Sequence, residues 1–258
     1  MNKITRKPKN PLNEKRVMVS IATLLNYNIA RLLNQTMLNK DQLPIHFCDP
    51  EVYPDYLAMN TEPGKYFLTH TTALAFYSYD KTFDNKDGLY NAIYYNDRKR
   101  LKHFRDRYRD IPFIIAPDYS IFDDIWRFEN EHRLFKIRIL MLWFALEIKA
   151  VVIPNAIYVA PEKMPLYYSG LEKCTVICFS TKGHIRRAEC RNRVKEAVQY
   201  ATDHLPLKTI LVYSVCGDDN KALRLFRYAT EQGIKIILVD NTLRRRNKSL
   251  MKREAVNE

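Results

Sequence analysis

The chain has 258 residues, of which 47% are apolar, so it can build one large hydrophobic core or two modest ones. Its 42 Lys and Arg residues outnumber its 29 Asp and Glu residues, and the formal net charge of +13 favours a polyanionic partner, above all nucleic acid. No apolar run reaches the roughly 18 residues of a membrane-spanning helix. The first 15 residues also lack the apolar region of a signal peptide, so we expect a soluble cytoplasmic protein without a membrane partner.

Glycine and cysteine usage disfavours three common kinds of site. The six glycines lie far apart, so neither GxGxxG nor a Walker phosphate loop can be formed. The five cysteines include no CxxC pair. Cys174 and Cys178 lie in the apolar run CTVICFS, where burial of two small side chains explains them better than zinc ligation does. We therefore predict no bound cofactor and no metal site from these residues.

Residues 1–40 predict a basic arm followed by an amphipathic helix. Residues 1–16 hold six Lys or Arg residues and two prolines, which is typical of a mobile arm. From Asn13, a suitable helix cap, apolar residues recur at spacings of three and four. The stripe of this helix would pack on the rest of the chain or on a second copy of it, which allows a homo-oligomer. Its members are Met18, Ile21, Leu25, Ile29 and Leu32.

Residues 41–241 predict a single α/β domain, followed by a basic C-terminal tail at 242–258. Prolines concentrate in the first part, and we expect residues 40–65 to form an irregular connection. Within residues 66–95, the segments YFLTHTTALAFYSYD and GLYNAIYY mix aromatic and β-branched residues around a turn-like DNKDG. This pattern predicts two strands.

A basic helix is predicted next, with Asn96 as its cap and Leu101, Phe104 and Tyr108 on one apolar stripe. Seven Lys or Arg residues lie between positions 98 and 109, against the single acid Asp106. Such a run is either an ordinary solvated helix face or a surface for an anion. The near absence of acids favours the anion, because salt bridges along the helix cannot satisfy so many cations.

From residue 111 to residue 240, apolar runs alternate with helical patterns. The runs FIIAPD, AVVIPN, TVICFST, TILVYS and KIILVD are five near-continuous apolar strands. Their alternation with helices predicts an α/β fold with a mostly parallel sheet and helices on both faces.

The helix after the first of these strands has two notable features. Ser120 and Asp123 are spaced nearly as in a capping box, which predicts that the helix begins there and that Asp123 and Asp124 are structural. The run ILMLWFAL, residues 139–146, is apolar on every side and predicts burial. We expect Trp126 and Trp143 to belong to the core.

Polar residues follow nearly every predicted strand, at the carboxyl edge of the sheet where parallel α/β folds hold their sites. Asp118 is open to two interpretations, a turn-forming residue or a site residue. No histidine lies in a motif that would identify a general base for Ser214 or Cys216, so a nucleophilic triad is not supported. The rim comprises Asp118, Ser120, Asn155, Ser180, Thr181, Ser214, Asp240 and Asn241.

The loop STKGHIRR, residues 180–187, combines a strand end with basic side chains. Lys182 follows the strand, and Arg186 and Arg187 are expected in the first turn of the next helix. A helix start offers free backbone N–H groups and a partial positive charge, so an anion could bind there. The alternative is an ordinary strand-to-helix turn with incidental basic residues.

Several strand-end motifs together resemble the domain of unknown function 4417, an uncharacterised family of phages, plasmids and integrative elements. The motifs are IAPDYSIFDDI, AVVIPN, TVICFSTKG and KTILVYS, and the resemblance spans roughly residues 41–240. It implies a mobile-element context and no defined chemistry. Where the family more often has Thr, Val and Gly, this chain has Asn155, Lys182 and Ser214, which make the rim more polar and more basic.

The first functional hypothesis is a nucleic-acid-binding accessory protein of a mobile element, with DNA as the favoured partner and phosphate contacts that carry little sequence preference. We expect its cations to lie together on one side of the molecule. Besides the N-terminal arm, they are Arg98, Lys99, Arg100, Lys102, Arg105, Lys182, Arg186, Arg187, Arg191, Arg193, Arg244, Arg245 and Arg246.

The alternative hypothesis is an enzyme that acts on a phosphodiester or a nucleotide at the carboxyl ends of the strands. Asp118 and Asp240 are its candidate metal ligands or acid–base carboxylates, and a divalent metal is expected only under this alternative.

Overall fold

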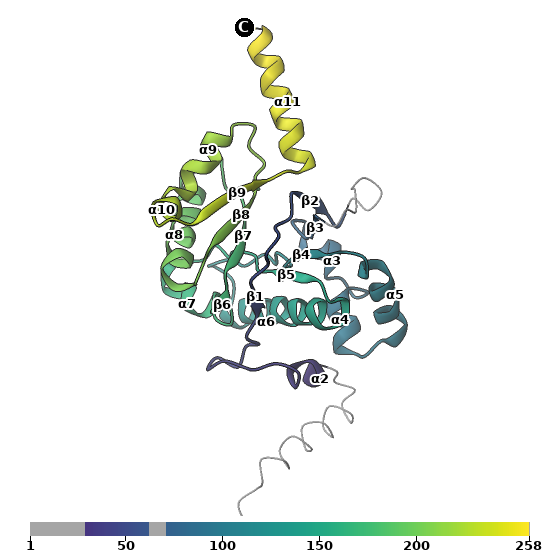
Figure 1. The fold of residues 1–258 in the computed structure, drawn as a ribbon. Helices are drawn as coiled ribbons and strands as arrows, with labels where there is room; N and C mark the ends of the chain where they lie inside the picture. The colour runs from purple at the N-terminus through teal and green to yellow at the C-terminus, as the bar shows by residue number, and fades with distance from the viewer. Residues whose placement is uncertain (1–28, 62–70, 258) are drawn as a thin grey trace, which may run out of the picture.

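The computed structural model describes residues 29–61 and 71–257 (Figure 1). It confirms an α/β fold with parallel sheets, and all five strands predicted after residue 111 are present. The strands are β1 (Phe47–Cys48), β2 (Tyr56–Met59), β3 (Thr72–Ala75), β4 (Phe113–Ile115), β5 (Val151–Ile153), β6 (Lys173–Cys174), β7 (Val176–Ser180), β8 (Thr209–Tyr213) and β9 (Lys235–Val239).

Helices occupy most of the connections between these strands. The basic arm and most of the predicted N-terminal helix lie outside the described residues, which begin with α2. The helical elements are α2 (Ile29–Leu33), α3 (Asp80–Phe83), α4 (Leu89–Tyr94), α5 (Arg98–Tyr108), α6 (Arg127–Trp143), η1 (Phe144–Ile148), η2 (Pro161–Lys163), α7 (Met164–Tyr167), α8 (Ala188–His204), α9 (Asp219–Leu223), η3 (Arg224–Phe226), α10 (Arg227–Glu231) and α11 (Thr242–Asn257). None of the described helices is long and apolar enough to cross a bilayer.

Two single bridges join the parallel sheets into a ring. Strands β2, β3, β4 and β5 form one sheet in that order, and β7, β8 and β9 form another. Asn155, just after β5, pairs with Cys178 of β7, and Asp240, just after β9, pairs with Tyr56 of β2. Backbone hydrogen bonds of 2.8 Å run from Leu57 N to Asp240 O and from Cys178 N to the carbonyl of residue 154. The carboxyl ends of seven parallel strands therefore surround one opening.

Side chains fill the inside of this ring. Tyr77 follows β3 and Tyr213 ends β8, on the opposite side of the ring of strands. The centroids of their aromatic side chains nevertheless lie 4.7 Å apart. The Tyr77 hydroxyl also reaches Asn155 and Cys178. A ring of so few strands has room for side chains and not for a pore, so a ligand cannot bind inside the ring and can reach it only at its end.

The apolar helix α6 is buried as predicted. Trp143 is 2% exposed, and α2 and α4 both pack against α6. Ile29 and Leu32 of α2 are buried too, so this end of the predicted N-terminal helix packs on the main domain. The prediction for Trp126 is wrong, because Trp126 is 85% exposed. It precedes the first residue of α6 and so lies outside the apolar stripe of that helix.

Three local predictions before residue 100 are also wrong. Residues 89–94 form helix α4 and not a strand, because its buried residues follow a helical spacing and not an alternation. Residues 40–65 contain β1 and β2 in addition to irregular chain. The cap of α5 is Asp97 and not Asn96, since Asp97 Oδ1 accepts a 3.0 Å hydrogen bond from Arg100 N.

A buried guanidinium ties α6 to the segment after α7. Arg138 is 1% exposed, and its Nη2 donates to Tyr167 O over 2.7 Å and to Ser169 O over 3.2 Å. Burial lowers the pKa of Arg138 to about 10, so the side chain still carries its charge at neutral pH. The two carbonyl groups have been removed from water and depend on this cation for their hydrogen bonds.

Substitution of Arg138 is expected to destabilise the fold strongly. Arg138→Ala leaves these carbonyls short of a donor and opens a cavity, so the free energy of unfolding should fall by about 3 kcal/mol. Arg127→Ala on the same helix is the matched control, because Arg127 is exposed and its one acidic partner in the described part of the chain is Glu131, one turn away. That change should stay within about 0.5 kcal/mol. Urea denaturation of the two variants checks the prediction, and equal losses would contradict it.

Candidate functional site

Two adjoining hollows lie at the carboxyl ends of the strands. The outer one, here called the rim hollow, has a volume of about 450 Å³, and its lining includes Tyr77, Asp118, Ser120, Ser180 and Lys182. The inner one measures about 250 Å³ and shares Tyr77 and Lys182 with the rim hollow. This is the edge at which parallel α/β folds place their ligands.

The side chain of Asp118 is held at the rim hollow by a hydrogen-bonded chain. Asn155 Nδ2 donates to Asp118 Oδ1 over 2.8 Å, and Asn155 Oδ1 accepts from the Tyr77 hydroxyl over 2.8 Å. The same hydroxyl lies 3.1 Å from Cys178 Sγ. Residues on or just after β3, β4, β5 and β7 thus fix the position of one carboxyl group.

Asp118 differs electrostatically from an ordinary surface carboxyl. Burial, and to a lesser extent the nearby carboxylate of Asp80, raises the pKa of Asp118 to about 7. The hydrogen bond from Asn155 and the positive charge of Lys182 act in the opposite direction. Both the protonated and the ionised forms of Asp118 are therefore populated at neutral pH, as a group that exchanges protons with a substrate requires.

Lys182 is the cation of the rim hollow. Its side chain lines both hollows, and its Nζ donates to the carbonyl of Tyr77 over 2.6 Å. The ammonium group has two further donors that this contact does not use. An anion in the rim hollow would thus meet Lys182 on one side and Asp118 on another.

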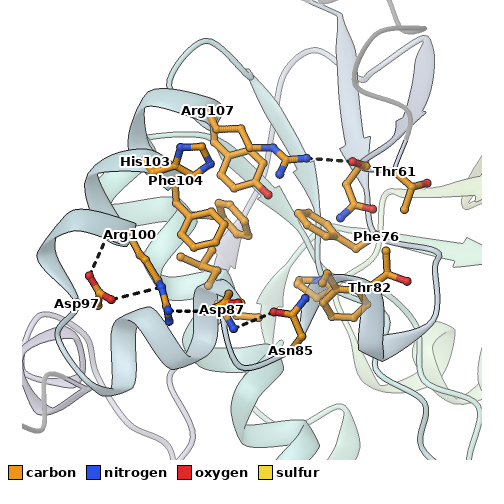
Figure 2. A pocket seen from close by; sticks show the side chains of 18 of the residues that line it. Thr61, Phe76, Thr82, Asn85, Asp87, Asp97, Arg100, His103, Phe104 and Arg107 are labelled. Atoms are coloured by element: carbon orange, nitrogen blue, oxygen red, sulfur yellow. Dashed lines mark hydrogen bonds and ion pairs between the residues drawn. The ribbon is translucent and has the colours of Figure 1, made fainter.

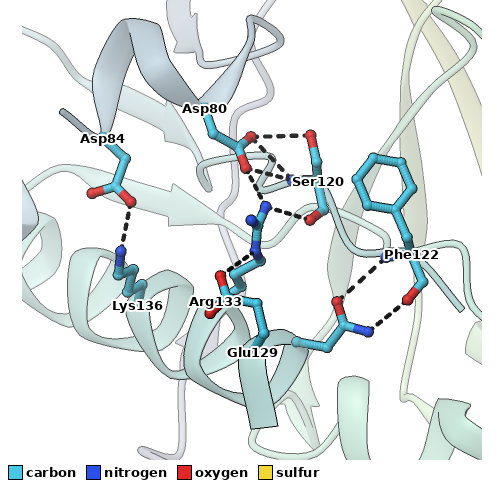
Figure 3. A network of polar contacts seen from close by, with 8 residues as sticks. Asp80, Asp84, Ser120, Phe122, Glu129, Arg133 and Lys136 are labelled. Atoms are coloured by element: carbon cyan, nitrogen blue, oxygen red, sulfur yellow. Dashed lines mark hydrogen bonds and ion pairs between the residues drawn. The ribbon is translucent and has the colours of Figure 1, made fainter. Parts of the chain in front are cut away.

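A polar network fixes the loop that carries Asp118 (Figure 3). Asp80, the first residue of α3, accepts hydrogen bonds from the backbone N–H and the hydroxyl of Ser120, each over 3.1 Å. Arg133 of α6 donates to Asp80 over 2.6 Å and to Ser120 O over 2.8 Å, and its Nε donates to Glu129 over 3.0 Å. Since Arg133 and Asp80 are mostly buried, this network holds the loop more rigidly than a surface ion pair would.

The expected capping box at the start of α6 is absent. Ser120 is bound to Asp80, and α6 begins only at Arg127, after Trp126 and without a side-chain cap. Asp123 instead pairs with Lys163 and Arg193. It is structural, as predicted, but it ties separate segments together instead of capping a helix.

The rest of the predicted rim divides into two groups. Ser180 lines the rim hollow, whereas Thr181, Ser214 and Asn241 are buried and connect strand ends. Thr181 Oγ1 accepts from Val215 N over 3.0 Å, and Asn241 Nδ2 donates to Ser214 O over 2.9 Å. These three side chains stabilise the strand exits and are unavailable to a ligand.

Asp240, the second candidate carboxylate, is committed to other contacts. Its Oδ2 accepts from Arg245 Nε over 2.6 Å, and its Oδ1 accepts from Asn241 N over 2.9 Å. Asp240 does not line either hollow. Among the described residues, no group of three or more His, Cys, Asp or Glu side chains is arranged to hold a metal ion.

The predicted cations do not share one face, so that expectation is wrong. Figure 1 shows α5 and α8 on opposite sides of the molecule, with α11 projecting from a third place. Many of these cations also have acidic partners that the sequence pattern could not reveal. The pairs are Arg100 with Asp87 and Asp97, Lys102 with Asp106, Arg105 with Glu147, Arg193 with Asp123 and Glu196, Arg244 with Asp219, and Arg245 with Asp240.

The loop 180–187 is longer than predicted. Helix α8 begins at Ala188, so Arg186 and Arg187 precede the helix and do not occupy its first turn. Both are exposed, and neither has an acidic partner within the described part of the chain. Arg191 of α8 donates to the carbonyls of Ile185 and Arg186 and so closes the loop.

Sequence reasoning missed two tyrosines that support the site. Tyr77 connects Asn155, Cys178 and Lys182. Tyr158 accepts from Ser180 N over 2.9 Å and donates to Ser180 O over 2.8 Å. The available signal was the position of Tyr77 directly after the strand-like TALAF, since a polar group at a strand end is a site candidate whatever its residue type.

Comparisons with known proteins identify no relative. No family model matches the chain, and searches of curated proteins and of solved structures give no match. The resemblance to the domain of unknown function 4417 therefore stays a prediction from the sequence.

The pH dependence of stability tests the environment of Asp118. A carboxyl whose folded pKa is raised binds its proton more tightly in the folded state, so its contribution to stability is full below the unfolded pKa and is lost as pH rises through the folded value of about 7. Asp118→Asn mimics the protonated acid and removes this loss. We expect the variant to gain roughly 1–3 kcal/mol relative to the parent between pH 4 and pH 8.

Urea denaturation at several pH values measures this difference. Asp106→Asn is the control, because Asp106 is exposed on α5 and pairs with Lys102 on the surface of that helix. A parallel pH profile for the parent and for Asp118→Asn would show that Asp118 has an ordinary pKa.

Proposed function

We propose that this protein is an enzyme that hydrolyses a phosphate ester, a phosphodiester or a nucleotide, in the rim hollow. The single observation that carries the proposal is that Asp118 and Lys182 line the same hollow at the carboxyl ends of the parallel strands. Asp118 is the acid–base residue and Lys182 binds the anionic group. An acid near its pKa beside a fixed cation in a concave site is a combination typical of catalytic centres.

Water is the second reactant. Asp118 in its ionised form takes a proton from the water, whose oxygen forms a new bond to phosphorus while the bond from phosphorus to the ester oxygen breaks. The leaving oxygen is then protonated by Asp118, which returns to its ionised form. Lys182 stabilises the charge that develops on the phosphoryl oxygens. Asn155 and Tyr77 position Asp118 without touching the substrate.

The assay decides whether hydrolysis needs a divalent metal ion. Asp118 would supply one carboxylate ligand, and a phosphate ester supplies oxygen ligands of its own. Hydrolysis is therefore to be measured with Mg²⁺, with Mn²⁺ and with a chelator.

Hydrolysis of nitrophenyl phosphate and bis(nitrophenyl) phosphate tests the assigned roles. Asp118→Asn keeps the shape of the side chain but cannot exchange a proton, so kcat should fall by about 100-fold or more. Lys182→Met keeps the length of the side chain and removes its charge, so KM should rise about tenfold and kcat should fall as well.

Asp240→Asn is the matched control, since Asp240 also follows a strand but pairs with Arg245 outside the hollows. It should hydrolyse both esters at close to the parent rate. A parent rate in Asp118→Asn, or a stronger defect in Asp240→Asn than in Asp118→Asn, would remove Asp118 from the proposal.

A second candidate function, nucleic-acid binding with DNA as the favoured partner, has one specific observation in its favour. Arg186 and Arg187 are exposed in the same loop as Lys182 and have no acidic partner within the described residues. A phosphate backbone that crosses the rim hollow could contact all three. This candidate no longer needs α5 or α11, where Arg100, Arg105, Arg244 and Arg245 are each paired with an acid.

Gel shifts of single- and double-stranded DNA over a series of salt concentrations test this candidate. Changing Arg186 and Arg187 to Ala together should weaken binding and reduce the slope of log K against log salt by about two, since each lost phosphate contact contributes about one. Arg105→Ala, which removes a cation already paired with Glu147, should leave the slope unchanged. Equal slopes for the parent and the double variant would rule out the loop as a phosphate-binding surface.

A further inference from the structure

A second, roomier cavity lies outside the ring of strands (Figure 2). Its volume is about 900 Å³, and it lies between α3, α4 and α5 and the carboxyl ends of β2 and β3. Cavities of roughly 300–1,000 Å³ accommodate a cofactor or a small-molecule ligand. It meets the rim hollow at Thr61 and Thr82, which line both.

Aromatic side chains form one wall of this cavity. Phe104 and Tyr108, one turn apart on α5, have nearly parallel rings with centroids 6.1 Å apart. Phe76 and Phe144 contact Tyr108 edge to face, at 6.3 and 5.3 Å. Such a wall favours a flat, aromatic ligand, which can pack against ring faces and edges.

Basic side chains of the same helix, α5, line the cavity beside these aromatic rings (Figure 2). Lys99, Arg100 and Arg107 are its cations, as their spacing on one helix face allows, and His103 lines it as well. Arg100 pairs with Asp87 and Asp97, which also line the cavity.

The two remaining cations differ in their contacts. Arg107 donates to Asn60 O over 3.1 Å and lies 5.3 Å from the ring centroid of Tyr108. Lys99 has no acidic partner among the described residues and is free to bind an anionic group of a ligand.

A buried acceptor in the same cavity lacks a partner. Asn60, which follows β2, is 7% exposed and lines the cavity, and its Oδ1 has no hydrogen bond within the described residues. Buried polar atoms are nearly always hydrogen-bonded in folded proteins. A ligand that presents an N–H group at this depth would satisfy Asn60 Oδ1.

We propose that this cavity binds a nucleoside monophosphate. The base packs against Phe104 and Tyr108 and presents an N–H group to Asn60 Oδ1, and the phosphate lies at the rim with Lys99. An aromatic wall, an unpaired amide oxygen and an unpaired ammonium group match the three chemical parts of this ligand class: a flat ring, a polar ring edge and an anion. The inference goes beyond the proposed hydrolysis, because binding here requires no reaction at Asp118.

Isothermal titration calorimetry with AMP, GMP, CMP, UMP, adenosine and inorganic phosphate tests the proposal on the full chain. At least one nucleotide should bind, and it should bind more tightly than its separate parts. Lys99→Ala should weaken nucleotide binding about tenfold, the value of one charge-assisted contact. Lys102→Ala on the same helix is the matched control, because Lys102 faces solvent, pairs with Asp106 and does not line the cavity. Its effect should stay below about twofold.

Phe104→Ala provides an independent variant, checked for folding by its thermal transition. If the variant folds, it should bind the nucleotide more weakly than the parent does and bind inorganic phosphate as the parent does. If it does not fold, the comparison of the two lysine variants decides alone. The proposal is overturned if none of the four nucleotides binds at millimolar concentration, if phosphate binds as tightly as the nucleotides, or if the two lysine variants lose equal affinity.

Repeating the titration with Asp118→Asn separates this inference from the proposed hydrolysis. Unchanged nucleotide binding in that variant supports two separate sites. If Asp118→Asn loses nucleotide binding while Lys99→Ala keeps the parent affinity, the nucleotide binds in the rim hollow and the assignment of the cavity is overturned.

Discussion

The architecture depends on two backbone bridges that close the parallel sheets into a ring. One joins Asn155 to Cys178 and the other joins Tyr56 to Asp240. Without them the two larger sheets would be separate layers, and the strand ends that carry polar side chains would not surround a common opening. Closure also forces side chains of opposite strands into contact, so the inside of the ring is filled and a ligand can reach the ring at its end but not within it.

The apolar interior of the ring of strands sets the protonation behaviour of the carboxyl group at the rim hollow. Asp118 lies above a packed interior, so desolvation raises its pKa, while Asn155 holds the carboxyl group in one place. Asp80 serves both as a structural partner of Ser120 and Arg133 and as a second negative charge near Asp118. The network that makes the loop rigid therefore also tunes the acid that the loop presents.

Net charge did not reveal which cations have acidic partners. The excess of 13 positive charges describes the field at a distance, whereas contacts decide which cations are available at close range. On α5, Arg100 and Arg105 are paired with acids from other segments, while Lys99 faces a cavity with an aromatic wall. The same basic helix that suggested a polyanion surface thus offers one free cation to a small ligand.

Residue periodicity within short segments was enough to predict the parallel α/β class, the strands after residue 111, the burial of Trp143 and the position of Asp118 at a strand end. The closure of the ring, the exposure of Trp126 and the chain of contacts from Asp118 through Asn155 to Tyr77 became visible in the folded chain alone. Each of these joins residues that are tens of positions apart or depends on where an element ends. The burial of a side chain and the pairing of a charge depend on which residues surround it in space. A local sequence pattern does not say which distant residues these will be.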